Sequence, residues 1–384
     1  MTDHQIPDSS LSHIRRVQEF LSHLPASVIS RLNLDKTLPL QVKFGSDVEN
    51  KFYLSGQNII SRKFIRSPLI ETLDHELGNR GLTWKPGGAG YGSAPSVFEE
   101  GSCIEYLLRP GDPESFVKAF DQAKETVNDV AENAGLTVVT SNPHIHISAY
   151  QGDRNLMALK DLNFELLRTI VNGIHDYQSN LPAFFVRPRI AENQPEPVKI
   201  MRPCEIGPYK GARAFSFNRT DSRASIRAKY HTAGRYMTIE SRLSPLPTAQ
   251  TTALHLDAIR SGLVNGEDSA FTGEACRYKE MPIKEFMSEG QEATVRLSEG
   301  CPLIQRGEGG YLEMLSQTIE SLNSYNPFTQ GQTHEMLSHC FRAYSAYLDT
   351  PLAQTRYSQE QVENLRQQAL EAVSSTPAPA VQPA

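Results

Sequence analysis

The stretch HIHISAY, residues 144–150, places two histidines two positions apart in a run of β-forming residues, directly after an Asn-Pro pair. Side chains at positions i and i+2 of a strand point to the same face, so His144 and His146 share one face while Ile145 and Ile147 point to the other. This alternation predicts a sheet with one face on an apolar core and imidazoles on the other. The histidines are either ordinary sheet residues or part of a binding site.

Three further predicted strands carry acidic residues. These are Asp47 and Glu49 in FGSDVENKF, Glu105 in CIEYLL, and Glu240, which shares a face with Arg242, in MTIESRLSP. A merely solvated face carries polar residues of every type, whereas these faces carry carboxylates, imidazoles and guanidinium groups. Such groups are the ligands of hard divalent cations together with an anionic substrate.

Three arginines, Arg219, Arg223 and Arg227, stand in NRTDSRASIR, shortly before the strand of Glu240. Paired Mg²⁺ or Mn²⁺ ions need several carboxylates, and arginines bind the phosphate oxygens that share their charge. The pattern favours phosphoryl chemistry. Taken singly, each motif also has an ordinary interpretation: a solvated acidic face, structural histidines, or an arginine-rich hairpin covering acidic surface. Their joint occurrence in one order favours the functional interpretation.

Periodicity predicts an α+β protein with a mainly antiparallel sheet. An amphipathic helical segment occupies residues 1–40, with Ser9 or Ser10 as its N-cap. The helix at 112–135 has the clearest ends: Asp112 caps it, Pro113 opens it and Gly135 closes it. Other helices are predicted at 67–79, 159–178, 248–266 and through much of the region up to 372, and strands at 40–56, 103–111, 136–150, 212–219, 224–231 and 235–243.

Several segments lack such periodicity. Residues 81–98 are Gly-rich and are predicted to form a loop or a loosely paired strand, EEGS at 99–102 a turn, and the Pro-rich residues 181–213 a lid loop. The Pro/Ala-rich tail, 373–384, is predicted to be disordered.

Composition excludes several classes of function. The chain has 384 residues and a net charge of -6, which argues against nucleic-acid binding. No apolar run approaches the ~20 residues of a membrane span, and the first residues do not resemble a signal peptide. Five scattered cysteines without a CxxC pair argue against a disulfide framework. A cytoplasmic protein without nucleic-acid or membrane partners is therefore expected.

The order of these motifs resembles the glutamine synthetase superfamily. The resemblance lies in KFGSDVENKFYL, PHIHIS and the long segment FNRTDSRASIRAKYHTAGRYMTIESRLSPLPTAQTTALHLDAIRSGLVNG, and covers roughly residues 42–266. It implies a curved antiparallel sheet forming half a barrel and flanked by helices, the catalytic fold shared with guanidino kinases. The catalytic domain would span residues 41–372, and the helical segment 1–40 stands where the family has a β-grasp domain.

The resemblance also implies an activity: ATP and two Mg²⁺ or Mn²⁺ ions phosphorylate a carboxylate, and a nitrogen nucleophile attacks the acyl phosphate. Asp47, His144 and Glu240 would hold one ion, and Glu49 and Glu105 the other. The nucleotide phosphates would be bound by His146, Arg219, Arg223 and Arg227. Arg242 would stabilise the acyl phosphate, and Arg202 would bind the substrate carboxylate. Glu205 would shield the intermediate and accept a proton from the amine.

Departures from the family's motifs change what is expected of the cation ligands and of the substrates. The second cation lacks a matched third carboxylate, for which Glu99 or Glu100 is a candidate. The different N-terminal segment favours an amine over ammonia. The SNP sequence before His144 replaces the glycines with which the family contacts its amino-acid substrate, so the expected acid is widened from glutamate to glutamate or a related amino acid. The expected partners are then an amino acid and an amine as small-molecule substrates. The resemblance is also compatible with a homo-oligomer. Two alternatives stay open: a phosphotransferase on the same fold and a non-catalytic nucleotide-binding regulator.

Overall fold

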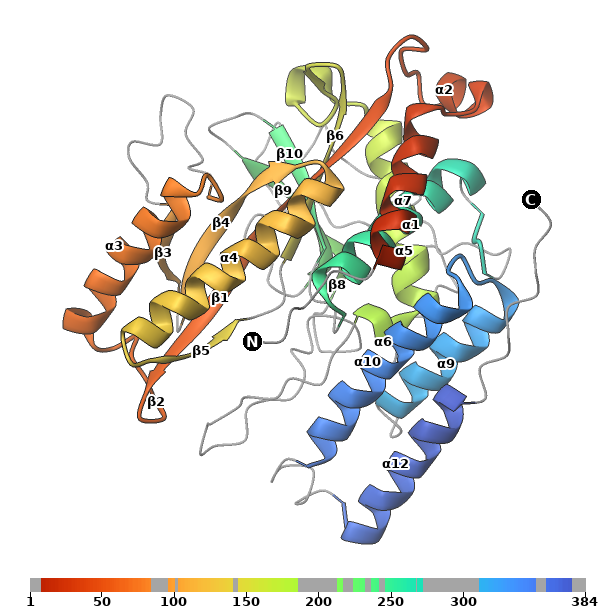
Figure 1. Ribbon diagram of the computed structural model, residues 1–384. Helices are drawn as coiled ribbons and strands as arrows, with labels where there is room; N and C mark the ends of the chain where they lie inside the picture. Colours follow the sequence, from red (N-terminus) through yellow and green to blue (C-terminus); the bar gives the residue numbers. More distant parts are fainter. Residues whose placement is uncertain are drawn as a thin grey trace.

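A computed structural model describes residues 8–83, 96–100, 103–140, 144–185, 213–216, 224–231, 236–241, 246–266, 268–271, 311–349 and 357–374. These residues form one curved sheet flanked by helices, with three further helices gathered at the C-terminal end (Figure 1). None of the helices in these segments is long and apolar enough to cross a membrane.

Within the described segments the sheet has ten strands, and seven of them form its main path. Their order is β3 (Val97–Glu100), β4 (Cys103–Gly111), β1 (Leu40–Leu54), β6 (His144–Gln151), β10 (Tyr236–Ser241), β9 (Ala224–His231) and β8 (Arg213–Ser216). The short strands β2 (Gln57–Asn58) and β5 (Thr137–Thr140) pair with β1, and β7 (Arg154–Asn155) pairs with β6. Neighbours run antiparallel except for β8 and β9, which are parallel. The predicted curved and mainly antiparallel sheet is confirmed.

Strand β1 lies inside the sheet, between β4 and β6, and shows the predicted alternation. Val42, Phe44 and Val48 are each at most 4% exposed and belong to the apolar core, as does Ile147 of the neighbouring β6. The intervening residues of β1, including Asp47, carry the polar groups of the opposite face. One face of the sheet is therefore core and the other is available for chemistry.

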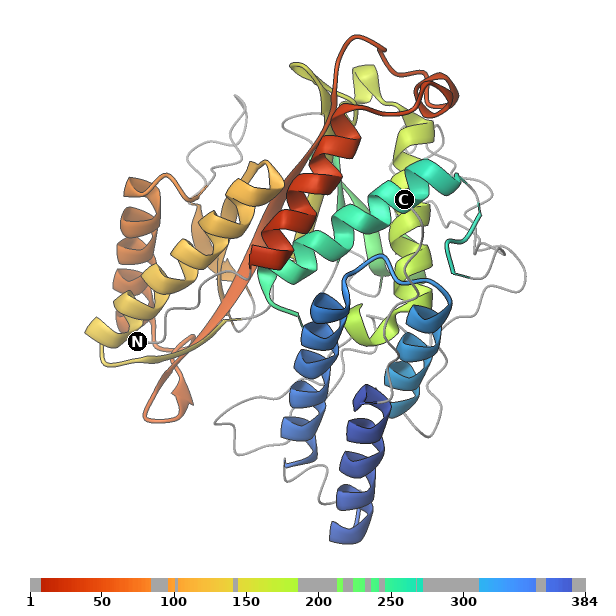
Figure 2. The ribbon, with the colours of Figure 1, turned by 45° about the vertical axis from the view of Figure 1, so that its right-hand side comes forward.

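Helices cover the core face. In Figures 1 and 2, α1 (Asp8–Ser22), α4 (Pro113–Asn133) and α7 (Thr248–Asn265) lie across the sheet, α3 (Lys63–Asn79) flanks α4, and α5 (Phe164–Asn180) packs on α7. Short helices α2 (Ala26–Arg31), η1 (Leu159–Asp161) and α6 (Pro182–Phe185) connect them, and α9 (Tyr311–Ser324), α10 (Gln330–Leu348) and α12 (Gln359–Ser374) gather beside α6.

The predicted caps of α4 are confirmed. Asp112 is its N-cap and accepts a hydrogen bond from the Ser115 backbone N–H at 3.0 Å, Pro113 opens the helix, and Gly135 follows its end with φ of 66°. Both ends are set by short-range chemistry, because a carboxylate satisfies an otherwise unbonded N–H and glycine tolerates positive φ.

Other boundaries differ from the prediction. Ser9 and Ser10 lie inside α1, so neither is its N-cap. Helix α3 begins at Lys63 and continues through Pro68, because Leu69 and the later apolar residues of its inner face bury against the core. The predicted helix at 159–178 is a 3₁₀ turn followed by α5, and α12 reaches two residues into the predicted tail.

A buried polar network connects α1 to α7 and α5. The Asp257 carboxylate of α7 lies 3.4 Å from His13 Nε2 and accepts hydrogen bonds from Arg260 at 2.8 Å and the Tyr177 hydroxyl at 2.5 Å. Burial opposes the charge of Asp257, but the His13 hydrogen bond and the Arg260 charge outweigh it and lower the pKa of that carboxyl. Ile14, Val17 and Leu21 of α1 are buried in the same core, so α1 is part of the packed structure.

Candidate metal centre

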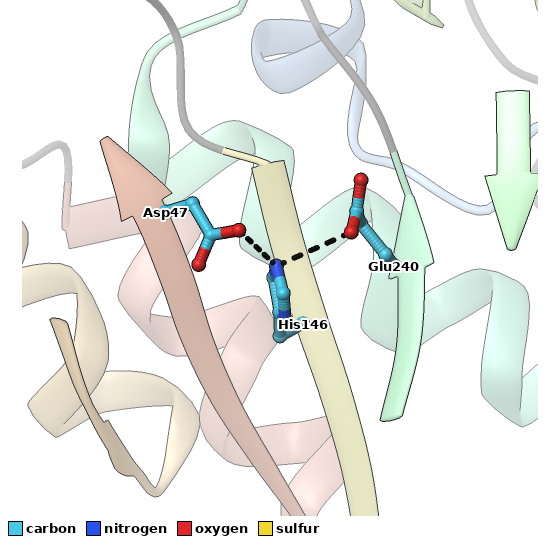
Figure 3. A group of neighbouring side chains, drawn as sticks. All are labelled: Asp47, His146 and Glu240. Carbon is cyan, nitrogen blue, oxygen red and sulfur yellow. Dashed lines mark ion pairs between the residues drawn. The ribbon is translucent and has the colours of Figure 1, made fainter. Parts of the chain in front are cut away.

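Three adjacent strands bring Asp47, His146 and Glu240 together on the polar face of the sheet (Figure 3). His146 Nε2 lies 3.1 Å from Asp47 Oδ2 of β1 and 3.6 Å from Glu240 Oε2 of β10. The register explains the meeting, since β6 lies between β1 and β10 and pairs His146 directly with Glu240. Asp47 pairs with His144, whose side chain shares a face with that of His146, so all three residues of the group point to the same side of the sheet.

The donor set fits a divalent cation. One ligand atom from each of Asp47, His146 and Glu240 lies within 4.8 Å of the others. All three residues are buried, and Glu240 is 0% exposed. Two carboxylates held this close and away from water repel each other unless positive charge lies between them. Two carboxylate oxygens and one imidazole nitrogen suit Mg²⁺, Mn²⁺ or Zn²⁺.

The two histidines have different places in this cluster. The sequence motifs assigned His144 to the cation and His146 to the phosphates. In the structure the imidazole between the two carboxylates is that of His146, whereas His144 Nδ1 lies 3.9 Å from Glu240 Oε1 at the edge of the group. Both imidazoles lie on the polar face, and His146 is oriented further by Thr238, whose hydroxyl lies 3.4 Å from its Nδ1.

A second acidic group lies further along the same face. Glu49 of β1 is directly opposite Glu105 of β4, which is 4% exposed. The thiol of Cys103 lies 3.7 Å from Glu49 Oε2. The sequence motifs did not reveal Cys103 as a neighbour of this pair. Its position two residues before Glu105 on the same strand does place the two side chains on one face, and this spacing could have predicted the contact.

The two candidates for a third carboxylate, Glu99 and Glu100, differ in the β4 residues with which they pair. They lie in strand β3, which is a correction to the turn predicted for EEGS at 99–102, of which residues 101–102 lie outside the described part. Glu99 pairs with Ile104 of the core face, and its carboxylate binds Arg66 of α3 at 2.9 Å. Glu100 takes the register position opposite Cys103, on the parity of Glu105.

The predicted phosphate-binding and substrate residues mostly fall outside the described segments. Arg202, Glu205, Arg219, Arg223 and Arg242 are among them, together with residues 186–212 of the predicted lid and most of the Gly-rich segment. Arg227 lies on β9, where its backbone pairs with Glu240. That register places Arg227 one strand from the cluster.

Comparison with known proteins identifies the fold. No family profile and no curated protein sequence matches the chain. Among solved structures, a GmaS/ADP complex has a TM-score of 0.53 at 13% identity, covering 92% of this chain and 76% of that one. Ligand-free GmaS and a cryo-EM structure of Plasmodium falciparum glutamine synthetase each give 0.52 at 13% identity; they cover 94% and 93% of this chain, and the alignment covers 78% of each. The chain therefore has a glutamine synthetase-like fold, as its motifs predicted.

Proposed function

We propose that this protein is an ATP-dependent ligase that joins a carboxylate to an amine through an acyl phosphate. The observation that carries the proposal is the buried group of Asp47, His146 and Glu240 on a glutamine synthetase-like sheet. One of the matching structures is an ADP complex, which supports a nucleotide as the co-substrate here. The acid is glutamate or a related amino acid, and the protein works in the cytoplasm.

The chemistry follows from the weakness of a carboxylate as an acyl donor. One carboxylate oxygen attacks the γ-phosphorus of ATP, and ADP leaves. The amine then attacks the acyl carbon, loses a proton, and inorganic phosphate departs with the C–O bond electrons. Divalent cations supply electrostatic stabilisation of the charge on the transferring phosphoryl group.

The chain's own residues divide this task. Asp47, His146 and Glu240, with His144 beside them, would hold one cation. Glu49 and Glu105 would hold the second, with Glu100 favoured over Glu99 because the latter is turned to Arg66. The proposed phosphate-binding arginines are Arg219, Arg223 and Arg227, with Arg242 at the acyl phosphate, Arg202 at the substrate carboxylate and Glu205 as the base.

Hydroxylamine trapping tests the reaction. The purified protein is incubated with ATP, Mg²⁺ and a set of amino acids in the presence of hydroxylamine, and hydroxamate and ADP are measured. An acid-dependent hydroxamate, lost in Glu240→Gln, is the expected result. A stable phosphorylated product without hydroxamate would contradict the ligase and support a phosphotransferase. Tight Mg²⁺-ATP binding with neither product across the set would instead support a regulatory protein.

A further inference from the structure

Ser241 is the last residue of β10 and directly follows Glu240. Consecutive strand residues point to opposite faces, so Ser241 lies on the core side while Glu240 faces the cluster. The registers agree, because Ser241 pairs with Ile145 and Glu240 with His146. Ser241 is 1% exposed, and its hydroxyl lies 2.8 Å from His255 Nε2 on α7. The back of the strand is thereby tied to a helix at the position next to the carboxylate.

The hydrogen-bonding roles in this contact are fixed by its other partners. His255 Nδ1 lies 2.8 Å from the Thr251 carbonyl oxygen, which can only accept, so Nδ1 carries the proton. Nε2 is then an acceptor, and the Ser241 hydroxyl donates to it. The Gln178 amide of α5 donates to the same hydroxyl at 3.4 Å. Ser241 therefore connects β10 to both α5 and α7.

The surroundings keep His255 neutral and immobile. Its ring makes an edge contact with Phe185, with centroids 5.4 Å apart and planes at 70°. The residue is 2% exposed, and burial lowers the pKa of His255 to about 4. At neutral pH the ring keeps the lone pair that the Ser241 hydroxyl requires.

We propose that Ser241 and His255 are positioning residues: they hold the end of β10 so that the Glu240 carboxylate keeps its place between His144 and His146 for cation binding. This inference rests on the cation site of the proposed function. A carboxylate that must meet a cation from one direction loses affinity when its strand is free to shift, and removal of such a supporting contact typically weakens metal binding about 10- to 100-fold.

Manganese binding tests the proposal without reference to turnover. The Kd for Mn²⁺ alone is measured from the electron paramagnetic resonance signal of free Mn²⁺ in wild type, Ser241→Ala, Glu240→Gln and Ser261→Ala. Ser261 is a matched control, since it is a buried hydroxyl on the same helix as His255 and accepts one hydrogen bond from Asn265 at 3.0 Å. We expect Ser241→Ala to raise the Kd about tenfold and Ser261→Ala to leave it within about twofold.

A second pair of variants applies if Ser241→Ala does not fold. His255→Gln retains a side-chain acceptor for the Ser241 hydroxyl and is expected to bind Mn²⁺ nearly as wild type does, whereas His255→Leu should lose affinity as Ser241→Ala does. Equal affinities in wild type, Ser241→Ala and His255→Leu, with binding still lost in Glu240→Gln, would overturn the positioning role alone. Absence of Mn²⁺ binding in wild type, or no effect of Glu240→Gln, would overturn the cation site and this inference with it.

Discussion

Gly173 of α5 and Gly262 of α7 face each other where the two helices cross, with backbone against backbone. A Cβ on Gly262 would lie 2.6 Å from the Thr169 carbonyl oxygen and 3.1 Å from Gly173 Cα, and a Cβ on Gly173 would collide with the Ala258 carbonyl oxygen. Neither site has room for a methyl group. Helix α7 also carries His255, which contacts Ser241 of β10.

Gly173→Ala is expected to lower the free energy of unfolding by about 2–3 kcal/mol, because overpacking a rigid helix crossing forces the backbones apart. Gly78→Ala is the matched control. Gly78 lies near the end of α3, and a Cβ added there would meet no atom within 4 Å, so alanine should add about 0.5 kcal/mol through helix propensity. Urea unfolding measures both; equal effects would contradict the close contact.

Cation binding should depend more on His146 than on His144. His146 Nε2 is near both carboxylates, whereas His144 is near Glu240 alone and at a longer distance. We expect His146→Ala to raise the Kd for Mn²⁺ at least tenfold and His144→Ala to raise it only a few-fold. Turnover should fall in both, since each lies on the polar face. The reverse order of Mn²⁺ affinities would return His144 to the place that the motifs gave it.

Glu99 should be dispensable for the second cation. Its side chain is 41% exposed and paired with Arg66, while Glu105 is buried on the polar face opposite Glu49. Glu105→Gln is therefore expected to weaken Mn²⁺ binding at the second site about tenfold or more, and Glu99→Gln to leave it unchanged. Isothermal titration with Mn²⁺ distinguishes them, and a loss of affinity in Glu99→Gln would contradict the register argument.

Stability should fall as the pH is lowered from about 6.5 to 4. Burial lowers the pKa of both His175 and His255 to about 4, while the same side chains in the unfolded chain titrate near 6.5. Below pH 6.5 the unfolded state binds more protons, so the contribution of each neutral ring is complete above that pH and is lost progressively toward pH 4. Each histidine accounts for about 3 kcal/mol. Urea midpoints at pH 7 and 4.5 check this, and His255→Gln should reduce the difference by roughly half.

The N-cap of α4 should be worth about 1 kcal/mol. Asp112→Ala leaves the Ser115 N–H without its side-chain acceptor, whereas Asp112→Asn keeps a side-chain oxygen and serves as the control. Thermal unfolding of the two variants gives the comparison. A matching loss in both would assign the effect to charge and not to the hydrogen bond.

The elements that the sequence predicted well are those decided by near neighbours in the chain. Strand β4 has the predicted bounds, and the caps of α4 depend on Asp112, Pro113 and Gly135 alone. Alternation within each strand placed Asp47 on the face of Glu49, His144 on the face of His146 and Glu240 on the face of Arg242. Such reasoning identifies the polar face of each strand without any knowledge of pairing.

What the sequence left undecided depended on pairing and packing. Which imidazole lies between the carboxylates follows from strand register, which a motif does not reveal, and Glu99 differs from Glu100 only through the pairing of β3 with β4. Helix α3 passes through Pro68 because tertiary burial outweighs local propensity. The contact of Ser241 with His255 joins a strand to a helix beneath it, and nothing in either segment alone predicts it.

The order of strands across the sheet also has a kinetic consequence. The residues of the Asp47, His146 and Glu240 cluster come from strands roughly a hundred residues apart in sequence, and β6 must pair on both edges before they meet. Loops of that length close slowly, so the cluster is expected to assemble late in folding. A cation that binds there stabilises the folded state by mass action. Because the site exists only after the strands have paired, cation binding is expected to follow completion of the sheet.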